Sequence, residues 1–150
     1  MTSKKDIEDF IGKKCIAVVG VSGSGKKFGA AVYRDLKQKG WRAFGVNPRG
    51  GSIEGDPLYE TLDKIPQTPD AAVFVVPPKV TEEMVQEAHK LGIKNIWLQP
   101  GAESAAAVEF CQSKGLNVIY GECILMHAAP VGSIHKVHRF LHKLFGKLPQ

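Results

Sequence analysis

The sequence predicts an α/β fold in which a parallel sheet lies between two layers of helices, and three observations support it. Strand and helix patterns alternate along the chain with short connections. The strand segments are continuous apolar runs, which is typical of strands covered on both faces. Each strand ends in, or is soon followed by, glycine or proline. We therefore expect a Rossmann-like three-layer sandwich with a five-stranded parallel sheet, helices on both faces and right-handed crossovers.

The first third of the chain predicts two helices and two strands. Residues 6–11 form a short helix because their apolar side chains gather on one face. A continuous apolar run over 15–20 ends in glycine and indicates a buried strand. Over 28–39 the apolar residues recur every three to four positions, as on one face of a helix, and Gly40 ends it. A second strand follows over 41–46.

The same alternation continues in the middle of the chain. Residues 59–65 predict a short helical segment, bounded by prolines. Residues 71–76 form a third apolar strand, closed by two prolines. Thr81 then opens a helix as an N-cap, and this helix runs to Leu91.

The last third predicts two more strands and two helices. A strand over 95–98 ends at a Pro-Gly pair, and Ser104 caps an alanine-rich helix that runs to residue 114. The fifth strand covers 117–120. The tail over 133–145 predicts an amphipathic helix with one apolar stripe.

Composition bounds the kind of protein. The 150 residues are 43% hydrophobic and 23% charged, which suits one soluble domain over residues 1–150. No stretch approaches the roughly 20 apolar residues of a membrane span, and the N-terminus does not resemble a signal peptide, so the cytoplasm is expected. The three cysteines lack metal-like spacing and are expected to be free thiols. The net charge of +5 suits an anionic ligand but is weak evidence alone.

The loop over residues 20–29, GVSGSGKKFG, carries the strongest functional signal. Its glycines and serines lie between a buried strand and a helix, so several backbone N–H groups gather at the helix N-terminus. Lys26 and Lys27 add positive charge close by. We predict that this loop holds phosphate groups; the alternative is a plain turn that uses glycine for its geometry.

Two well-known phosphate motifs do not fit this loop. Gly20 with Gly25 and Lys26 satisfies GxxxxGK, but Lys27 occupies the position of the magnesium-binding serine or threonine. The dinucleotide motif GxGxxG would need glycine at Phe28, and the second strand ends in Asn47 rather than in an acid that grips the ribose of NAD. Arg42 and Arg49 lie near this strand in sequence and favour a phosphorylated ribose. Both coenzyme A and NADP carry one.

An ordered series of short motifs resembles a known family. The series is AVVGVS at 17–22, KFG at 27–29, GVNP at 45–48, Gly55, Asp70, VVPP at 75–78, WLQPG at 97–101 and GEC at 121–123. It resembles the small stand-alone CoA-binding domain proteins, similar in turn to the N-terminal CoA-binding domain of succinyl-CoA synthetase α subunits. The resemblance covers about residues 12–135. The synthetase's phosphorylated histidine lies in a second domain that has no counterpart here, so its ligase chemistry is not carried over.

The resemblance implies that CoA lies across the carboxyl edge of the sheet. The phosphates would lie on Ser22, Gly23, Ser24, Gly25, Lys26, Lys27, Phe28 and Gly29. Asn47, Pro48 and Arg49 would line the nucleotide end. Val76, Pro77 and Pro78 would form an apolar wall, and Gln99, Pro100 and Gly101 would line the opposite side.

The remaining candidates have simpler readings. Cys123 follows the fifth strand, where it could form a mixed disulfide with a CoA thiol, but a small apolar residue at a strand end is the preferred explanation. His135, His138 and His142 share one side of the tail helix, yet the lysines and arginine around them would repel a metal ion. The tail's apolar stripe suits packing on the sheet or on a second subunit, so a homodimer is considered.

The sequence contains no catalytic triad, carboxylate dyad or metal motif. The function expected is therefore binding of CoA or acyl-CoA without catalysis, with no nucleic acid and no membrane as partner. Two alternatives stay open: an NAD(P)-binding domain of the oxidoreductase type, and a redox-responsive interaction protein acting through Cys123.

Overall fold

The computed structural model describes residues 3–13 and 15–128, and the predicted helix over 133–145 lies outside them. Four α-helices and seven strands alternate in the described chain. In order, these are α1 (Lys4–Ile11), β1 (Cys15–Val19), α2 (Phe28–Gln38), β2 (Arg42–Val46), β3 (Ser52–Ile53), β4 (Asp56–Tyr59), the 3-10 turn η1 (Leu62–Lys64), β5 (Ala71–Phe74), α3 (Pro78–Lys90), β6 (Asn95–Leu98), α4 (Ala105–Ser113), β7 (Asn117–Tyr120) and the 3-10 turn η2 (Ile124–Met126).

The sheet has the strand order β3-β4-β2-β1-β5-β6-β7, and every neighbouring pair except β3 and β4 is parallel. The five predicted strands are β2, β1, β5, β6 and β7. Strand β1 is central, and its Val18 lies opposite Gly45 of β2 and Val73 of β5. The chain therefore moves from β1 to one side through α2 and later returns to the other side at β5, which makes the end of β1 the switch point of the sheet.

The prediction of five strands is wrong, because β3 and β4 extend the sheet to seven. These two strands form a hairpin whose turn residues, Glu54 and Gly55, have positive φ angles of 49° and 86°. Their antiparallel pairing covers only two residues of each strand, too few for a recognisable period. Pro57 also stands inside β4, where sequence reasoning treats proline as a breaker. The helical segment predicted over 59–65 is the end of β4 followed by η1.

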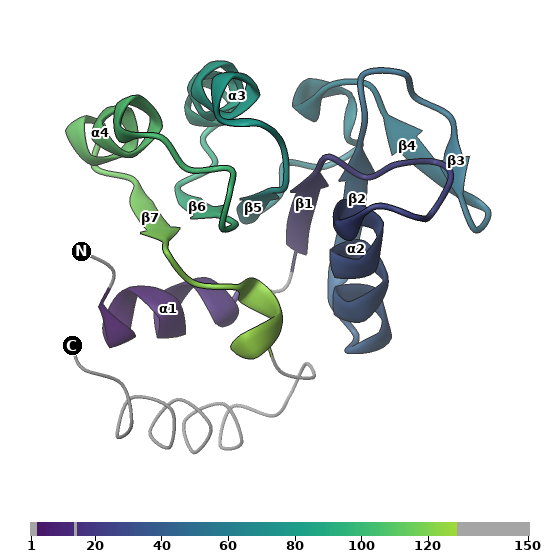
Figure 1. Cartoon of the computed structure of the whole chain (residues 1–150), viewed down its shortest axis with the longest axis horizontal. Helices are drawn as coiled ribbons and strands as arrows, with labels where there is room; N and C mark the ends of the chain where they lie inside the picture. The colour runs from purple at the N-terminus through teal and green to yellow at the C-terminus, as the bar shows by residue number, and fades with distance from the viewer. Residues whose placement is uncertain (1–2, 14, 129–150) are drawn as a thin grey trace.

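Helices cover both faces of the sheet, as predicted (Figure 1). Helices α1 and α2, with η2, pack on one face, where Phe10 meets Trp97 edge to face with ring centroids 5.2 Å apart. Helices α3 and α4 pack on the other face around Phe74 and Leu98. Within the described residues, no helix is long and apolar enough to cross a membrane.

Helix starts agree with the prediction at α4 and differ at α3. Ser104 caps α4, and its side chain accepts a hydrogen bond from the backbone N–H of Ala107. Thr81 does not cap α3, because this helix already begins at Pro78. Proline is well suited to a first helical position, where its missing N–H has no partner to lose. Thr81 is instead buried, and its hydroxyl lies 3.4 Å from the carbonyl oxygen of Pro77.

Candidate functional site

The carboxyl ends of the parallel strands gather the loop over residues 20–29 and the segments after β2, β5 and β6 at one edge of the sheet. This edge is where open α/β sheets bind ligands, at the switch point beside the central strand. Helices α2 and α3 both begin here, and neither N-cap residue, Lys27 nor Pro77, supplies a side-chain hydrogen bond to its helix. The free N–H groups of a first helical turn and the helix dipole attract anions.

Two glycines allow close backbone packing at the end of β1, one against the end of β5 and one against the start of α2. Gly20 has a φ of 106°, and a Cβ there would lie 2.2 Å from the carbonyl oxygen of Val75. A Cβ on Gly29 would lie 2.1 Å from the carbonyl oxygen of Gly20. Both distances are far below a normal contact, so only glycine allows this approach. The first turn of α2 is thereby held directly at the switch point of the sheet.

The loop itself forms a small cluster of donors. The hydroxyl groups of Ser22 and Ser24 lie 2.8 Å apart. The N–H of Ser24 points to the Ser22 hydroxyl at 3.3 Å, and the N–H of Lys26 points to the Ser24 hydroxyl at 3.4 Å. These two hydrogen bonds from backbone N–H groups are long and therefore weak. An anion at this position offers a stronger acceptor to two N–H groups and two hydroxyls, as in the backbone nests that hold phosphate.

Exposed positive side chains belong to the loop and to the segment that follows β2. Lys26, Lys27 and Arg49 are exposed, and within residues 3–13 and 15–128 none of them makes an ion pair. Phe28 is also half exposed at the start of α2. Arg42, in contrast, lies at the opposite end of β2 and donates to the side chain of Gln67. Of the two arginines near the second strand in sequence, only Arg49 follows its carboxyl end.

Asn47 connects the end of β2 to the loop. Its side-chain amide donates to the carbonyl oxygen of Val21 at 2.8 Å, and its side-chain oxygen accepts from the N–H of Arg49 at 2.9 Å. The neighbouring Pro48 is exposed. Asn47 therefore holds the turn that carries Arg49 and fixes the start of the glycine-rich loop. A direct contact with ligand would use the capacity that these two bonds leave.

The segments after β5 and β6 lie on the other side of the switch point. Val76 is half-buried, whereas Pro77, Pro78, Pro100 and Gly101 are exposed. Gln99 is 1% exposed, and its side chain turns away from the surface. Its oxygen accepts from the N–H of Ile124 at 2.7 Å, and its nitrogen lies 3.4 Å from the sulfur of Cys123. In this arrangement Gln99 ties the end of β6 to the segment after β7.

The thiols differ in their access to solvent. Cys123 is half-buried, while Cys15 and Cys111 are buried. Burial raises the pKa of Cys15 above its ordinary value and raises that of Cys111 to about 11. In the part of the chain that the structure describes, no three His, Cys, Asp or Glu side chains gather in a way that would hold a metal ion.

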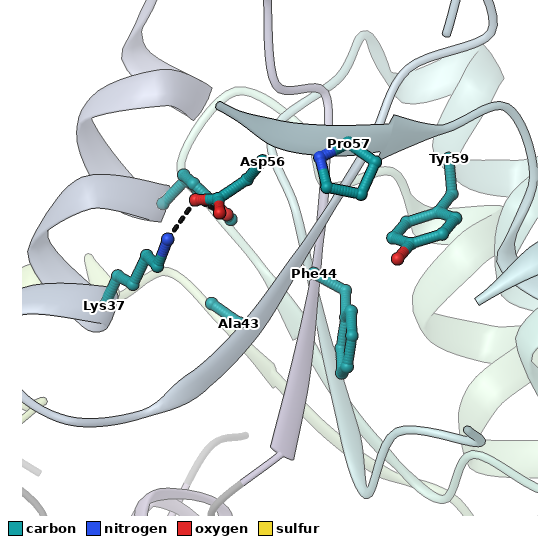
Figure 2. A pocket seen from close by; sticks show the side chains of 7 residues that line it. Lys37, Ala43, Phe44, Asp56, Pro57 and Tyr59 are labelled. Carbon is teal, nitrogen blue, oxygen red and sulfur yellow. Dashed lines mark hydrogen bonds and ion pairs between the residues drawn. The ribbon is translucent and has the colours of Figure 1, made fainter. Parts of the chain in front are cut away.

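A separate pocket lies away from this edge, where β4 diverges from β2 (Figure 2). The two strands pair only at Gly45–Leu58 and Val46–Tyr59, so the earlier part of β2 is left open on this side. The pocket is lined by Tyr33, Lys37, Ala43, Phe44, Asp56, Pro57 and Tyr59. Lys37 and Asp56 form an ion pair at one side of it. None of the residues predicted to hold the ligand lines this pocket.

The family follows from a comparison with known proteins. Residues 14–129 match the CoA binding domain family, and this match covers most of the chain. The chain belongs to this family. The resemblance inferred from the motif series is therefore confirmed. The glycine-rich loop, the end of β2 and the segments after β5 and β6 all lie within the matched range.

Its curated relatives include much longer enzymes. The chain is 27% identical over 129 residues to the alpha subunit of ADP-forming acetate–CoA ligase II from Pyrococcus furiosus, covering 79% of this chain and 28% of that subunit. It is 32% identical over 94 residues to the alpha subunit of the corresponding ligase I, covering 59% of this chain and 20% of the relative. The chain thus spans less than a third of the length of these relatives.

Two solved structures of similar size, and part of a larger one, share the fold. A conserved hypothetical protein from Pyrococcus furiosus is 39% identical with a TM-score of 0.71, covering 75% of this chain and 97% of that one. A hypothetical protein from Pyrococcus horikoshii is 26% identical with a TM-score of 0.77, covering 93% and 92%. A dinucleotide-forming acetyl-coenzyme A synthetase 1 from Ca. Korarchaeum cryptofilum is 26% identical with a TM-score of 0.59, covering 70% of this chain and 25% of the synthetase.

Proposed function

We propose that this protein binds coenzyme A or an acyl-CoA and holds its phosphates on the loop over residues 20–29. The observation that carries the proposal is the donor cluster of Ser22, Ser24 and Lys26 beside the start of α2, in a domain of the CoA binding family. Backbone N–H groups, hydroxyls and a helix dipole at one point favour a bound phosphate.

We assign the remaining site residues to different parts of the ligand. Arg49 would approach the 3′-phosphate, because it is exposed and its backbone is fixed by Asn47. Val76, Pro77 and Pro78 would form an apolar wall beside the pantetheine arm of the cofactor. Pro100 and Gly101 would line the opposite side, with Gln99 beneath them holding the segment in place.

We propose binding without catalysis as the role of this chain alone. The relatives whose names include a ligase activity are more than three times as long as the part that this chain matches. A ligase reaction is therefore not assigned to it. The chain would instead carry, sense or present the cofactor.

Titration calorimetry with four ligands tests this function. We expect CoA to bind more tightly than dephospho-CoA, NAD and NADP, because only CoA combines a pyrophosphate with a 3′-phosphate. Tighter binding of NAD or NADP than of CoA would overturn the proposal in favour of an oxidoreductase-type domain.

A pair of charge-matched variants separates the loop from general electrostatics. Lys26→Gln/Lys27→Gln removes two charges beside the donor cluster. Lys90→Gln/Lys94→Gln removes two exposed charges, at the last residue of α3 and just before β6, at the other edge of the sheet. We expect the first variant to weaken CoA binding at least about tenfold and the second to change it less than about twofold, since exposed distant charges are screened by salt. Equal effects would place the phosphates elsewhere.

The proposed contact of Arg49 has its own signature. Arg49→Ala should weaken binding of CoA but leave binding of dephospho-CoA nearly unchanged, because dephospho-CoA lacks the 3′-phosphate. The affinity ratio of the two ligands is the measured quantity. An unchanged ratio in Arg49→Ala would remove Arg49 from the site.

A further inference from the structure

Arg34 joins the phosphate loop to the β3–β4 hairpin. It projects from α2, and its Nη1 donates to the carbonyl oxygen of Gly25 at 2.7 Å. Its Nε donates to Oε1 of Glu54, in the hairpin turn, also at 2.7 Å. The planar guanidinium thus holds one backbone carbonyl and one carboxylate at the same time. A lysine has no second donor in fixed geometry and would not reproduce this arrangement.

The bond to Gly25 fixes the direction of one peptide group. In a trans peptide the C=O and the following N–H point in opposite directions. The carbonyl of Gly25 faces Arg34, so the N–H of Lys26 faces the other side, where it points to the hydroxyl of Ser24. Gly25 itself has a φ of 72°, which leaves its peptide to be oriented by such contacts. Arg34 therefore determines where one donor of the phosphate cluster points.

The hairpin gives the guanidinium a rigid support. Asp56 of β4 accepts a hydrogen bond from the Tyr33 hydroxyl at 2.9 Å. It also forms an ion pair with Lys37, drawn as the dashed line in Figure 2. The hairpin also contacts the loop directly, because the Cα of Gly23 lies so close that a Cβ would be 3.3 Å from the carbonyl oxygen of Ser52. The loop, α2 and the hairpin therefore each contact the other two.

We infer that Arg34, held by Glu54, is a positioning residue that preorganises the phosphate-binding loop, and this inference rests on the proposed function. The clamp orients the Gly25–Lys26 peptide before the ligand arrives, so less conformational entropy is lost on binding. Two of its five N–H donors bond to protein groups, one of them to the Gly25 carbonyl, so the role we assign to Arg34 is to orient the loop rather than to touch phosphate. The ion pair with Glu54 is exposed, so the clamp contributes little to overall stability.

Two variants distinguish positioning from direct contact. Arg34→Lys keeps the charge and loses the fork, and Glu54→Ala frees the arginine while removing a negative charge near the site. If Arg34 contacted phosphate, the lysine variant would retain most of the affinity and Glu54→Ala would bind CoA more tightly. If Arg34 positions the loop, both variants bind CoA more weakly, by about tenfold and about threefold. Tyr33→Phe removes a neighbouring helix–hairpin bond without touching the loop and serves as the control.

The experiment measures CoA affinity by calorimetry and, in the ligand-free protein, the 15N order parameter of the Lys26 amide. We expect that amide to become more mobile in Arg34→Lys and Glu54→Ala but not in Tyr33→Phe, with thermal midpoints nearly unchanged. Tighter CoA binding by Glu54→Ala, or an unaltered Lys26 amide in both variants, overturns the inference. If the wild-type protein binds no CoA, the proposed function fails, and the amide measurement still decides whether the clamp orders the loop.

Discussion

At the scale of single residues, Gly29 brings the first turn of α2 against Gly20, the residue that follows β1. A methyl group there would lie 2.1 Å from the carbonyl oxygen of Gly20. Because this oxygen belongs to the backbone and the Cβ position is fixed by the backbone of residue 29, neither atom can rotate away. We expect Gly29→Ala to lower the free energy of unfolding by about 2–3 kcal/mol, the upper part of the range found for overpacked sites. Chemical denaturation measures this change.

Gly12→Ala is the matched control for this prediction. Gly12 ends α1 with a φ of −76°, and a Cβ there would meet only Glu8 and Asp9 carbonyl oxygens at 3.4 and 3.7 Å. We expect its stability to stay within about 1 kcal/mol of wild type, since alanine restricts the unfolded chain without strain in the folded one. Similar losses in both variants would show that the contact between Gly29 and Gly20 is not what requires glycine.

The cysteines give a second test at this scale. Burial removes Cys15 and Cys111 from solvent and raises the pKa of both thiols, that of Cys111 to about 11, so little thiolate forms at pH 8. We expect iodoacetamide to label half-buried Cys123 first in the native protein. Peptide mapping by mass spectrometry follows the three sites, and unfolded protein, in which all three react, is the control. Native labelling of Cys111 as fast as Cys123 would contradict this order.

At the scale of elements, the sequence predicts those parts of the fold that repeat a period over enough residues. The apolar runs that correspond to β1, β5, β6 and β7 could be recognised because they are continuous. Ser104 indicated the start of α4 in the sequence, and in the structure its side chain caps this helix. The β3–β4 hairpin was not predicted, because its two strands pair with each other through only two residues each, and one of these residues is Pro57. Its place is set by pairing with β2 and by side-chain bonds to α2, both of which join residues far apart in sequence.

The candidate site shows the same division. The glycine-rich loop is a local pattern, so its position between β1 and the start of α2 could be predicted. The side chains around it could not, because their direction depends on tertiary contacts. Gln99 turns inward to Ile124, and Arg34 reaches the loop from a helix whose pattern indicates only an exposed polar position. The ligand contacts of the predicted residues stay predictions until binding is measured.

The docking of the hairpin on α2 predicts a pH dependence of stability. The hydrogen bond from Lys37, and then that from Tyr33, lower the pKa of Asp56 in the folded protein. The unfolded chain therefore takes up this proton first as the pH falls, near the ordinary pKa of about 3.9. The stability that Asp56 contributes is complete above that value and is lost as the pH falls further toward the lower folded pKa.

Asp56→Asn should accordingly be less stable than wild type at pH 7, and the difference should shrink as the pH falls below about 4. Urea denaturation at several pH values measures it. Asp9→Asn, which changes an exposed carboxylate of α1 outside the hairpin, is the control and should show no such convergence. A difference for Asp56→Asn that stays constant from pH 7 to pH 3 would mean that the ion pair does not hold the hairpin.

At the scale of the whole molecule, the proposed ligand position joins both helical layers. Helix α2 packs on one face of the sheet and α3 on the other, yet both begin at the carboxyl edge beside β1 and β5 (Figure 1). A ligand that spans this edge contacts elements from both hydrophobic cores. Opening either layer would then release it, so binding should stabilise the domain as a unit rather than one loop.

We therefore expect CoA at about 100 times its dissociation constant to raise the free energy of unfolding by about 2.7 kcal/mol. For a chain of 150 residues this corresponds to a rise of roughly 5–10 °C in the thermal midpoint. Hydrogen exchange should slow equally in β1, β5 and β6, because the same global opening governs all three strands. Protection confined to residues 20–29 would show that the ligand orders only its loop and does not bridge the two layers.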